Sequence, residues 1–382
     1  MLPLNSKLPS VGTTIFTVMS RLAEQHGAVN LSQGFPDFDP PPGLIERVEH
    51  YLGERCHQYP PMPGVVSLRA AISRKLHDLY GVSVDPDTSI TVTSGATEAI
   101  FCAVQALVRP GDEVVVLDPA YDSYEPSVTL AGGRTVHVPL TLPRFAIDWD
   151  ALESSLNART RLVIVNSPHN PSGALLDAAD LDRLAELLRP WDCYVLSDEV
   201  YEHVVFDGRQ HVTVLAQPQL AERSFAVFSF GKTYHATGWK LGYVVAPEPL
   251  SAELRRVHQY VTFASVSPLQ YALADFLSAH PEHPRALPQF YQDKRDYFCE
   301  LLAGTRFQFD PAAGTYFQLA DYSALSDLPD VEFARWLTIE HGVAVIPISV
   351  FYRQAPQMRL VRFCFAKERA TLDAAAERLA AL

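Results

Sequence analysis

The sequence predicts an α/β fold: a mostly parallel, seven-stranded sheet flanked by helices, with a smaller α+β domain beside it. Between residues 88 and 246, short runs rich in β-branched and aromatic residues alternate with stretches whose apolar residues recur every three or four positions. This alternation is typical of parallel strands joined by crossover helices. With 382 residues and a hydrophobic fraction of 48%, the chain can form two or three domains and a large core.

The strands of the large sheet are expected at residues 90–92, 113–117, 135–138, 162–165, 194–197, 225–229 and 242–245. Between them, residues 96–108 and 181–188 have the apolar spacing of crossover helices. Further along the chain, short strands mixed with helices are expected at residues 307–309, 316–319, 343–347 and 361–365.

Proline clusters suggest how the chain divides. Three prolines in residues 281–288 predict a break between the alternating region and the C-terminal part, and a proline cluster at 40–42 ends a non-alternating N-terminal stretch. We therefore expect an N-terminal segment (1–40) that packs with the small domain. It precedes a large ligand-binding α/β domain (41–284) and a small C-terminal α+β domain (285–382).

Charge and cysteine content limit the classes of partner and the cellular compartments that are expected for this protein. The net charge of -13 argues against a nucleic-acid partner, since binding to phosphate backbones depends on clustered lysine and arginine, and small-molecule partners are expected instead. The five cysteines are odd in number and form no CxxC pair, so neither a disulfide framework nor a metal site is expected. Residues 1–10 lack a signal-peptide pattern, and no run approaches the roughly 20 apolar residues of a membrane span. We expect a cytoplasmic protein.

One lysine stands directly after a predicted buried strand. Gly231 breaks the strand 225–229, so Lys232 is expected on a loop at its carboxyl end, where open α/β sheets hold ligands. An amine shielded from water has a lowered pKa, and a neutral amine can form a Schiff base with an aldehyde, the link used by pyridoxal 5'-phosphate (PLP) enzymes. Because most lysines are simply solvated, this hypothesis depends on the neighbouring residues.

Two other strand ends carry groups that a PLP site would need. Asp198 could keep the pyridine nitrogen protonated, although it could equally be the N-cap of a following helix. Asn170, in a proline-flanked loop, could donate to the phenolic oxygen of PLP, with Tyr201 as a second donor. His169 in the same loop is expected to be a solvated bystander.

A phosphate site is expected where strand 90–92 turns into the next helix. Helix N-termini favour anions, Gly95 permits close approach, and Ser94 or Thr97 can add hydrogen bonds, although the same residues could merely cap the helix. No GxGxxG motif follows a strand and no GxxxxGK[ST] motif occurs, so the phosphate of PLP is favoured over a dinucleotide or a nucleoside triphosphate.

Together these motifs resemble the fold-type I PLP-dependent enzymes, in particular the class I/II aminotransferases and their kynurenine/glutamine and methionine aminotransferase-like branch. The resemblance covers nearly the whole chain. It includes LSQGFPDF (31–38), QYP (58–60), SGAT (94–97), DPAYDSY (118–124), NSPHNPSG (166–173), SDEVY (197–201), SFGK (229–232) and VRF (361–363).

The resemblance implies a role for each cofactor-binding residue. Lys232 would form the Schiff base and shuttle a proton, and Asp198 would pair with the pyridine nitrogen. Asn170 and Tyr201 would hold the ring oxygen, and Tyr121 would stack on the ring. The phosphate ligands would be Gly95, Ala96, Ser229 and Lys240, with Tyr59 from the neighbouring subunit of a homodimer. Many relatives have arginine at the position of Lys240, so a point-charge contact is expected there.

The resemblance also implies a substrate site. Arg362 would bind the substrate α-carboxylate as a bidentate pair, with Asn170 and the backbone amide of Gly34 nearby. No second arginine is identified as a clamp for a side-chain carboxylate. The aligned pocket positions are apolar: Ile15, Phe16 and Phe263.

Transamination by a ping-pong mechanism is therefore the first functional hypothesis, with methionine, phenylalanine, tyrosine, kynurenine or glutamine as amino donor and a 2-oxo acid as acceptor. The alternative keeps PLP but ends in β-elimination from a cysteine S-conjugate or cystathionine. A PLP-sensing transcriptional regulator is disfavoured, because the family-like pattern begins by about residue 31 and the chain is acidic. A catalytically dead scaffold is disfavoured because each proposed site position holds a chemically competent residue.

Overall fold

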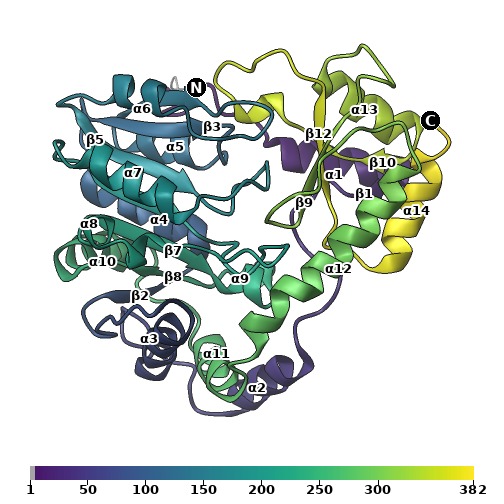
Figure 1. Ribbon diagram of the computed structural model, residues 1–382. Coiled ribbons are helices and arrows are strands. Elements are labelled where there is room, and N and C mark those ends of the chain that lie inside the picture. Colours follow the sequence, from purple (N-terminus) through teal and green to yellow (C-terminus); the bar gives the residue numbers. More distant parts are fainter. Residues whose placement is uncertain (1–4) are drawn as a thin grey trace.

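The computed structural model describes residues 5–382, and a seven-stranded sheet forms the middle layer of its larger part, on the left in Figure 1. The strand order is β2-β8-β7-β6-β5-β3-β4, and only β8 runs antiparallel to its neighbours within this sheet of the described chain. The strands are β2 (Ile90–Thr93), β3 (Glu113–Asp118), β4 (Arg134–Pro139), β5 (Thr160–Asn166), β6 (Tyr194–Asp198), β7 (Ser224–Ser229) and β8 (Gly242–Val245). The predicted α/β fold with a mostly parallel sheet is confirmed.

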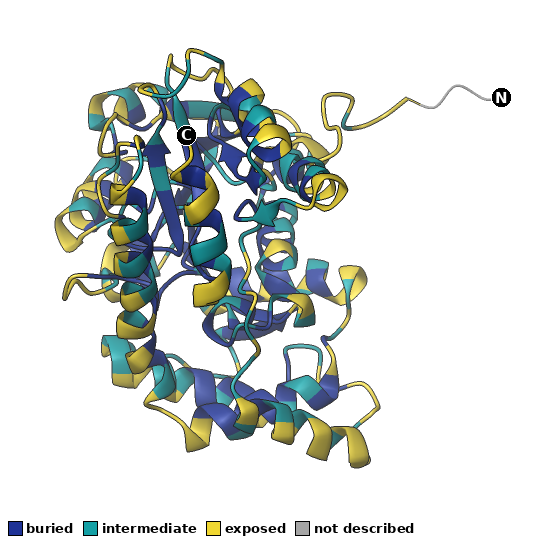
Figure 2. Cartoon of the chain, turned by 90° about the vertical axis from the view of Figure 1, so that its right-hand side faces the viewer, coloured by how far each residue is buried: buried dark blue, intermediate teal, exposed yellow. Residues whose placement is uncertain are grey.

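Helices cover both faces of this sheet, which is why its central strands are apolar throughout rather than alternating. Every residue of β3 is buried, and Figure 2 shows that the exposed residues gather on the outer sides of the helices. One face packs against α4 (Gly95–Leu107), α5 (Tyr124–Leu130) and α10 (Glu248–Val261). The opposite face packs mainly against α3 (Val66–Tyr80), α6 (Trp149–Ser155), α7 (Ala178–Leu188) and α11 (Ser267–Ala279).

The remaining elements of this region are short or peripheral. Helix α2 (Pro42–Gly53) packs on α11. The others are α8 (Pro218–Ala221), α9 (Phe230–Thr233), η1 (Val214–Ala216) and η2 (Thr237–Trp239). In the part of the chain that the structure describes, no helix is both long and apolar enough to span a bilayer.

A second core lies in the C-terminal part, around an antiparallel sheet of order β11-β12-β9. Its elements are β9 (Phe317–Asp321), α13 (Asp330–Glu340), β10 (Val343–Ala344), β11 (Ile346–Pro347), η3 (Ser349–Phe351), β12 (Leu360–Cys364) and α14 (Arg369–Leu379). The N-terminal stretch joins this core: α1 (Ile15–His26) packs on α13, and β1 (Val29–Asn30) pairs with β10 in parallel. Residues 1–4 of the predicted N-terminal segment lie outside the described residues.

Two local predictions for this region were wrong. Residues 307–309 do not form a strand, because their ladder is limited to one isolated bridge between Gln308 and Asp321. The expected single strand at 343–347 is divided into β10 and β11, which join different sheets. Val345 between them is fully buried, so the chain crosses the core there.

The proline-rich segment 281–288 forms the start of a helix rather than a break. Helix α12 (His283–Ala303) begins there and runs from the neighbourhood of α11 toward the C-terminal sheet (Figure 1). Pro284 occupies its first turn, where a missing N–H costs nothing, while Pro288 lies inside the helix. Proline content alone therefore could not distinguish a helix start from a linker.

Candidate active site

A cavity of about 210 Å³ opens at the carboxyl ends of β5, β6 and β7. Residues from the N-terminal stretch, the large sheet and the C-terminal core meet around it. The predicted site residues that line it are Phe16, Gly34, Gly95, Ala96, Tyr121, Asn170, Asp198, Tyr201, Ser229, Lys232, Lys240 and Arg362. This brings together titratable groups and an apolar wall, as is typical of a ligand site in an open α/β sheet.

Lys232 lies in the short helix α9 rather than on a loop. Its Nζ donates to the Gly34 carbonyl oxygen at 2.9 Å and to the Tyr316 hydroxyl at 2.8 Å. Gly231 allows this tight turn, because a Cβ there would lie 2.9 Å from the Thr237 Cα. Burial lowers the pKa of Lys232 to about 8, so about a tenth of the amine is neutral at pH 7, far more than for a solvated lysine.

Asp198 closes β6 with its carboxylate in the cavity wall. Tyr124 donates a hydrogen bond of 2.6 Å to its Oδ2, while burial raises the pKa of Asp198 to about 6. The residues after Asp198 form turns rather than a helix, so the alternative role as a helix N-cap is not realised. Its other oxygen, Oδ1, accepts a long hydrogen bond of 3.4 Å from the Val200 backbone N–H, which leaves the carboxylate able to accept from a ligand in the cavity.

Asn170 is fixed on two sides within its proline-containing loop. Its backbone N–H donates to the Asn166 side chain at 2.8 Å, and its Oδ1 accepts from Arg362 Nη1 at 2.8 Å. Asn170 lines the cavity, and within residues 5–382 its Nδ2 group makes no hydrogen bond, so it can donate to a ligand. His169 beside it is buried, with ring nitrogens 2.6 Å from the Ser172 hydroxyl and 3.0 Å from the Pro119 carbonyl oxygen, so its expected role as a solvated group was wrong.

The guanidinium of Arg362 is fully buried and only partly hydrogen-bonded. Besides its bond to Asn170, Nη2 donates to the Ser32 carbonyl oxygen at 3.1 Å, whereas Nε has no partner in the described part of the chain. The guanidinium carbon lies 3.8 Å from the ring centroid of Phe317 and 5.3 Å from that of Phe16. A buried, unpaired donor of this kind favours an anionic ligand such as a carboxylate.

The N-terminus of α4 forms a cradle for a phosphate. Gly95 has a φ of 80°, a backbone conformation that favours glycine, and the Lys240 amine lies close to it: a Cβ on Gly95 would be 3.4 Å from Lys240 Nζ. Ala96 and Ser229 complete the lining. Exposed backbone N–H groups, the helix dipole and one ammonium group together fit a phosphate.

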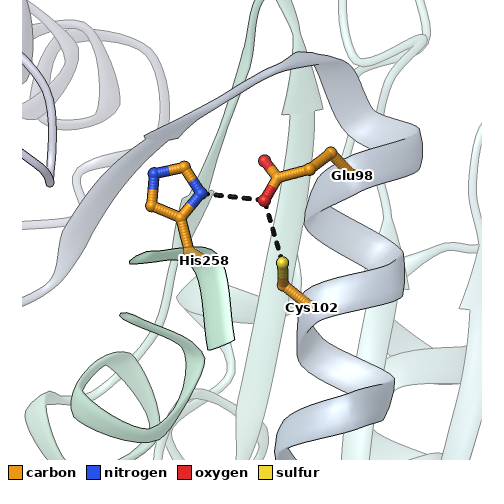
Figure 3. Close-up of side chains that lie close together, drawn as sticks. All are labelled: Glu98, Cys102 and His258. Carbon is orange, nitrogen blue, oxygen red and sulfur yellow. Dashed lines mark hydrogen bonds and ion pairs between the residues drawn. The ribbon is translucent and has the colours of Figure 1, made fainter. Parts of the chain in front are cut away.

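Behind this cradle, three side chains form a hydrogen-bonded cluster (Figure 3). Glu98 accepts from the ring of His258 and from the thiol of Cys102, both at 2.8 Å, and its second oxygen accepts from the Ser94 backbone N–H at 3.0 Å. Because Ser94 precedes Gly95, the cluster holds the first turn of α4 in place.

Three predicted site residues do not line the cavity in this chain. Tyr59 is 84% exposed, and its ring lies 5.2 Å from that of Phe263, which is also exposed. Both lie on the surface. Ile15 packs against the C-terminal core instead.

Two tyrosines that touch key groups were not among the predicted site residues. Tyr124 lies within the motif at 118–124, and the spacing of that motif alone does not show which tyrosine reaches Asp198. Tyr316 is fully buried beside Lys232, 84 residues away in sequence, so no local pattern could reveal it.

The chain is similar to known proteins along nearly its whole length. Residues 26–379 match the family described as aminotransferase class I and II. The chain is 56% identical over 374 residues to a methionine aminotransferase of Escherichia coli, covering 98% of this chain and 97% of that protein. It is 34% identical to the mouse kynurenine–oxoglutarate transaminase 1, covering 98% and 96%. A crystal structure of an Escherichia coli protein with methionine aminotransferase function superposes with a TM-score of 0.98 at 55% identity, over 100% of both chains.

Proposed function

Because this chain belongs to the class I and II aminotransferases, a PLP-dependent family, we propose that it transfers the amino group of an apolar or aromatic L-amino acid to a 2-oxo acid. Methionine, phenylalanine, tyrosine, kynurenine and glutamine are the candidate donors. The observation that carries this proposal is the meeting of Lys232, Asp198 and Arg362 around one cavity, which combines a nucleophilic amine, a buried carboxylate and a carboxylate receptor.

PLP, when bound, supplies an aldehyde that takes up the amino group and a ring that withdraws electrons from the substrate α-carbon. In our proposal Asp198 would face the ring nitrogen, where its carboxylate would keep a proton. Asn170 Nδ2 and the Tyr201 hydroxyl would donate to the ring oxygen, and Tyr121 would stack on the ring. Burial holds the pKa of Tyr201 far above its usual value, which supports a donor role because the phenol keeps its proton.

The phosphate would bind in the cradle at the start of α4. The Gly95 and Ala96 backbone and the Ser229 hydroxyl would donate hydrogen bonds, while Lys240 would contribute a point charge. The lysine amine lies above Gly95, where it can neutralise part of the phosphate charge.

Arg362 would hold the substrate α-carboxylate. Nε and the remaining N–H groups of its two terminal nitrogens can donate to both oxygens of a carboxylate without breaking the bonds to Asn170 and Ser32. Gly34, whose backbone amide would add a hydrogen bond, lies beside this guanidinium, since a Cβ on Gly34 would be 4.0 Å from Arg362 Nη2. This arrangement would aim the substrate α-carbon at Lys232, whose Nζ would take the α-proton.

The walls around Arg362 favour an apolar substrate side chain. Phe16, Phe317 and Phe351 all place their rings within 6 Å of the guanidinium carbon. Ile15 and Phe263 were expected to add to this wall. We propose that they do so in the homodimer, where a second copy would complete the pocket.

The test is the release of 2-oxo acid from single amino acids by the PLP-loaded protein. We expect methionine and aromatic donors to exceed aspartate in kcat/KM, and Lys232→Ala to abolish turnover. Highest efficiency with aspartate would refute the apolar pocket, and substantial activity of Lys232→Ala would refute the role of the lysine. Continuous release of pyruvate and ammonia from a cysteine S-conjugate would instead favour the lyase alternative.

We further propose a homodimer in a reducing, cytoplasmic compartment. The exposed pair Tyr59 and Phe263 would be covered by a second copy, and Tyr59 would reach the neighbouring phosphate site. All five cysteines are unpaired, as is typical of proteins kept under reducing conditions. The division into residues 1–40, 41–284 and 285–382 remains our proposal for the domains.

A further inference from the structure

The geometry points to Tyr316 as a positioning residue that orients the amine of Lys232 for proton transfer. This inference rests on the proposed function, in which Lys232 Nζ takes the proton from the substrate α-carbon. Tyr316 lies directly before β9, in the C-terminal core, whereas Lys232 lies in α9, which directly follows β7 of the large sheet. Its hydroxyl accepts from Lys232 Nζ at 2.8 Å.

The hydrogens around this amine can be counted. A neutral amine has two N–H bonds and one lone pair. The structure provides two acceptors: the Tyr316 hydroxyl at 2.8 Å and the Gly34 carbonyl oxygen at 2.9 Å. With both N–H bonds directed at these oxygens, the lone pair is left to face another group.

Tyr316 is unable to compete for that lone pair. Its single hydroxyl hydrogen is donated to the Gly34 carbonyl oxygen at 2.7 Å. The hydroxyl oxygen therefore acts toward Lys232 as an acceptor, and the phenol cannot donate a hydrogen bond that would occupy the base. Burial keeps the pKa of Tyr316 well above its usual value, so the phenol holds this hydrogen throughout the working pH range.

The ring of Tyr316 is itself held rigidly. It is fully buried, with ring centroids 5.0 Å from Tyr201, 5.6 Å from Tyr291 and 5.0 Å from Phe317. An acceptor on such a ring has one position, which makes it suitable for aiming a flexible lysine side chain. The Gly34 carbonyl alone would leave Nζ free to rotate about one hydrogen bond.

The experiment compares Tyr316→Phe with Tyr322→Phe. Tyr322 is also fully buried and directly follows β9, and its hydroxyl donates to the Leu328 carbonyl oxygen at 2.8 Å. The control variant therefore also loses one buried, hydrogen-bonded tyrosine hydroxyl, but one that does not line the cavity. For each PLP-loaded protein, the single-turnover rate with methionine is measured with and without deuterium at the α-carbon. We expect Tyr316→Phe to slow the step about 10- to 100-fold and to increase the deuterium isotope effect, with Tyr322→Phe unchanged.

A second readout uses the cofactor-free protein. The pKa of Lys232 is obtained from the pH dependence of its labelling by an amine-reactive reagent, followed by mass spectrometry of the Lys232 peptide. Because the Tyr316 oxygen accepts more strongly from a charged amine, its removal should lower this pKa by roughly half a unit to one unit. Tyr322→Phe should leave it unchanged.

The outcomes separate this inference from the proposed function. An unchanged isotope effect and an unchanged Lys232 pKa in Tyr316→Phe would overturn it, and so would loss of PLP loading in that variant alone, which would indicate a purely structural role. If the wild-type protein releases no oxo acid from any donor, the proposed function fails, while the labelling experiment still tests the contact between Tyr316 and Lys232.

Discussion

Arg362 and Asn170 lie 192 residues apart in sequence, yet a hydrogen bond of 2.8 Å joins the guanidinium to the amide oxygen. In the proposed function this bond links the receptor for the substrate carboxylate to the donor that faces the cofactor ring. It also fixes the orientation of the Asn170 amide, because an oxygen that accepts from Arg362 leaves the NH₂ group directed elsewhere.

Replacing Asn170 with alanine should therefore impair both substrate and cofactor binding. We expect KM for methionine to rise and kcat to fall, each by about tenfold. Loss of the amide oxygen leaves Arg362 without a partner that orients it, and loss of the amide NH₂ group removes a donor to the cofactor ring. Steady-state kinetics with PLP in excess provides the measurement. Asn157→Ala is the matched control, because Asn157 bonds to Glu113 far from the cavity. A change in KM alone would argue against a cofactor contact.

Arg362→Lys tests whether the carboxylate is held by a planar, bidentate donor. A lysine keeps the charge but not the fork, so kcat/KM for methionine should fall by about 100-fold or more. Methioninamide, which lacks the carboxylate, serves as the control substrate. Both the wild type and Arg362→Lys should process it poorly. If the wild-type enzyme did not prefer methionine over its amide, Arg362 would not be the carboxylate receptor.

Much of this site could be predicted from the sequence because its groups follow strands. Lys232 and Asp198 each stand at or just after the end of a run of buried residues, and parallel strands bring such ends to one edge of the sheet. The strands of the large sheet were predicted for the same reason: their apolar runs are unbroken because helices cover both faces.

Contacts between distant segments could not be predicted in this way. Tyr316 reaches Lys232 only because the C-terminal core packs beside the large sheet, and its bond to the Gly34 carbonyl spans 282 residues. The isolated bridge at Gln308 and the helix that begins at the prolines near 284 likewise depend on tertiary packing, which overrides local propensity.

The lowered pKa of Lys232 predicts how fast the cofactor-free protein captures PLP at different pH values. Burial lowers the pKa to about 8, and the neutral amine is the nucleophile, so the rate should rise through this region and level off above about pH 9. The appearance of the visible absorption band provides the rate. A rate that continues to climb toward pH 10.5, as for a free lysine derivative measured in parallel, would show that the amine is solvated.

Tyr124→Phe should weaken cofactor binding most at lower pH. Burial raises the pKa of Asp198, whereas the hydrogen bond from Tyr124 lowers it, so the variant should have a carboxyl group that protonates more readily. We expect the Kd for PLP to rise several-fold at pH 6.5 and less at pH 8.5, as measured by fluorescence titration. Tyr51→Phe is the control, because Tyr51 donates to Asp275 at 2.7 Å outside the cavity. An equal loss at both pH values would contradict a role for Asp198 ionisation.

His169 should make folding stability sensitive to acid. Burial lowers its pKa from 6.5 to about 4, so between these values the unfolded chain binds more protons than the folded protein. The stabilisation from keeping this ring neutral is fully present above about pH 6.5 and is lost as the pH falls toward 4, amounting to about 3 kcal/mol. Asp198, whose pKa is raised to about 6, acts in the opposite direction, since its contribution is lost as the pH rises from 4 to 6.

A comparison of variants separates the contribution of His169 to the pH dependence of unfolding from the opposite contribution of Asp198. His169→Asn keeps a polar side chain but removes the titration, so its free energy of unfolding should fall less steeply between pH 6.5 and 4 than that of the wild type, as measured by urea unfolding of the cofactor-free proteins. His26→Asn, at an exposed position at the end of α1, should retain the wild-type slope. Because His169 bonds to Ser172 and to the Pro119 carbonyl oxygen beside Asn170, an unchanged slope in His169→Asn would mean that this loop opens to water before the protein unfolds.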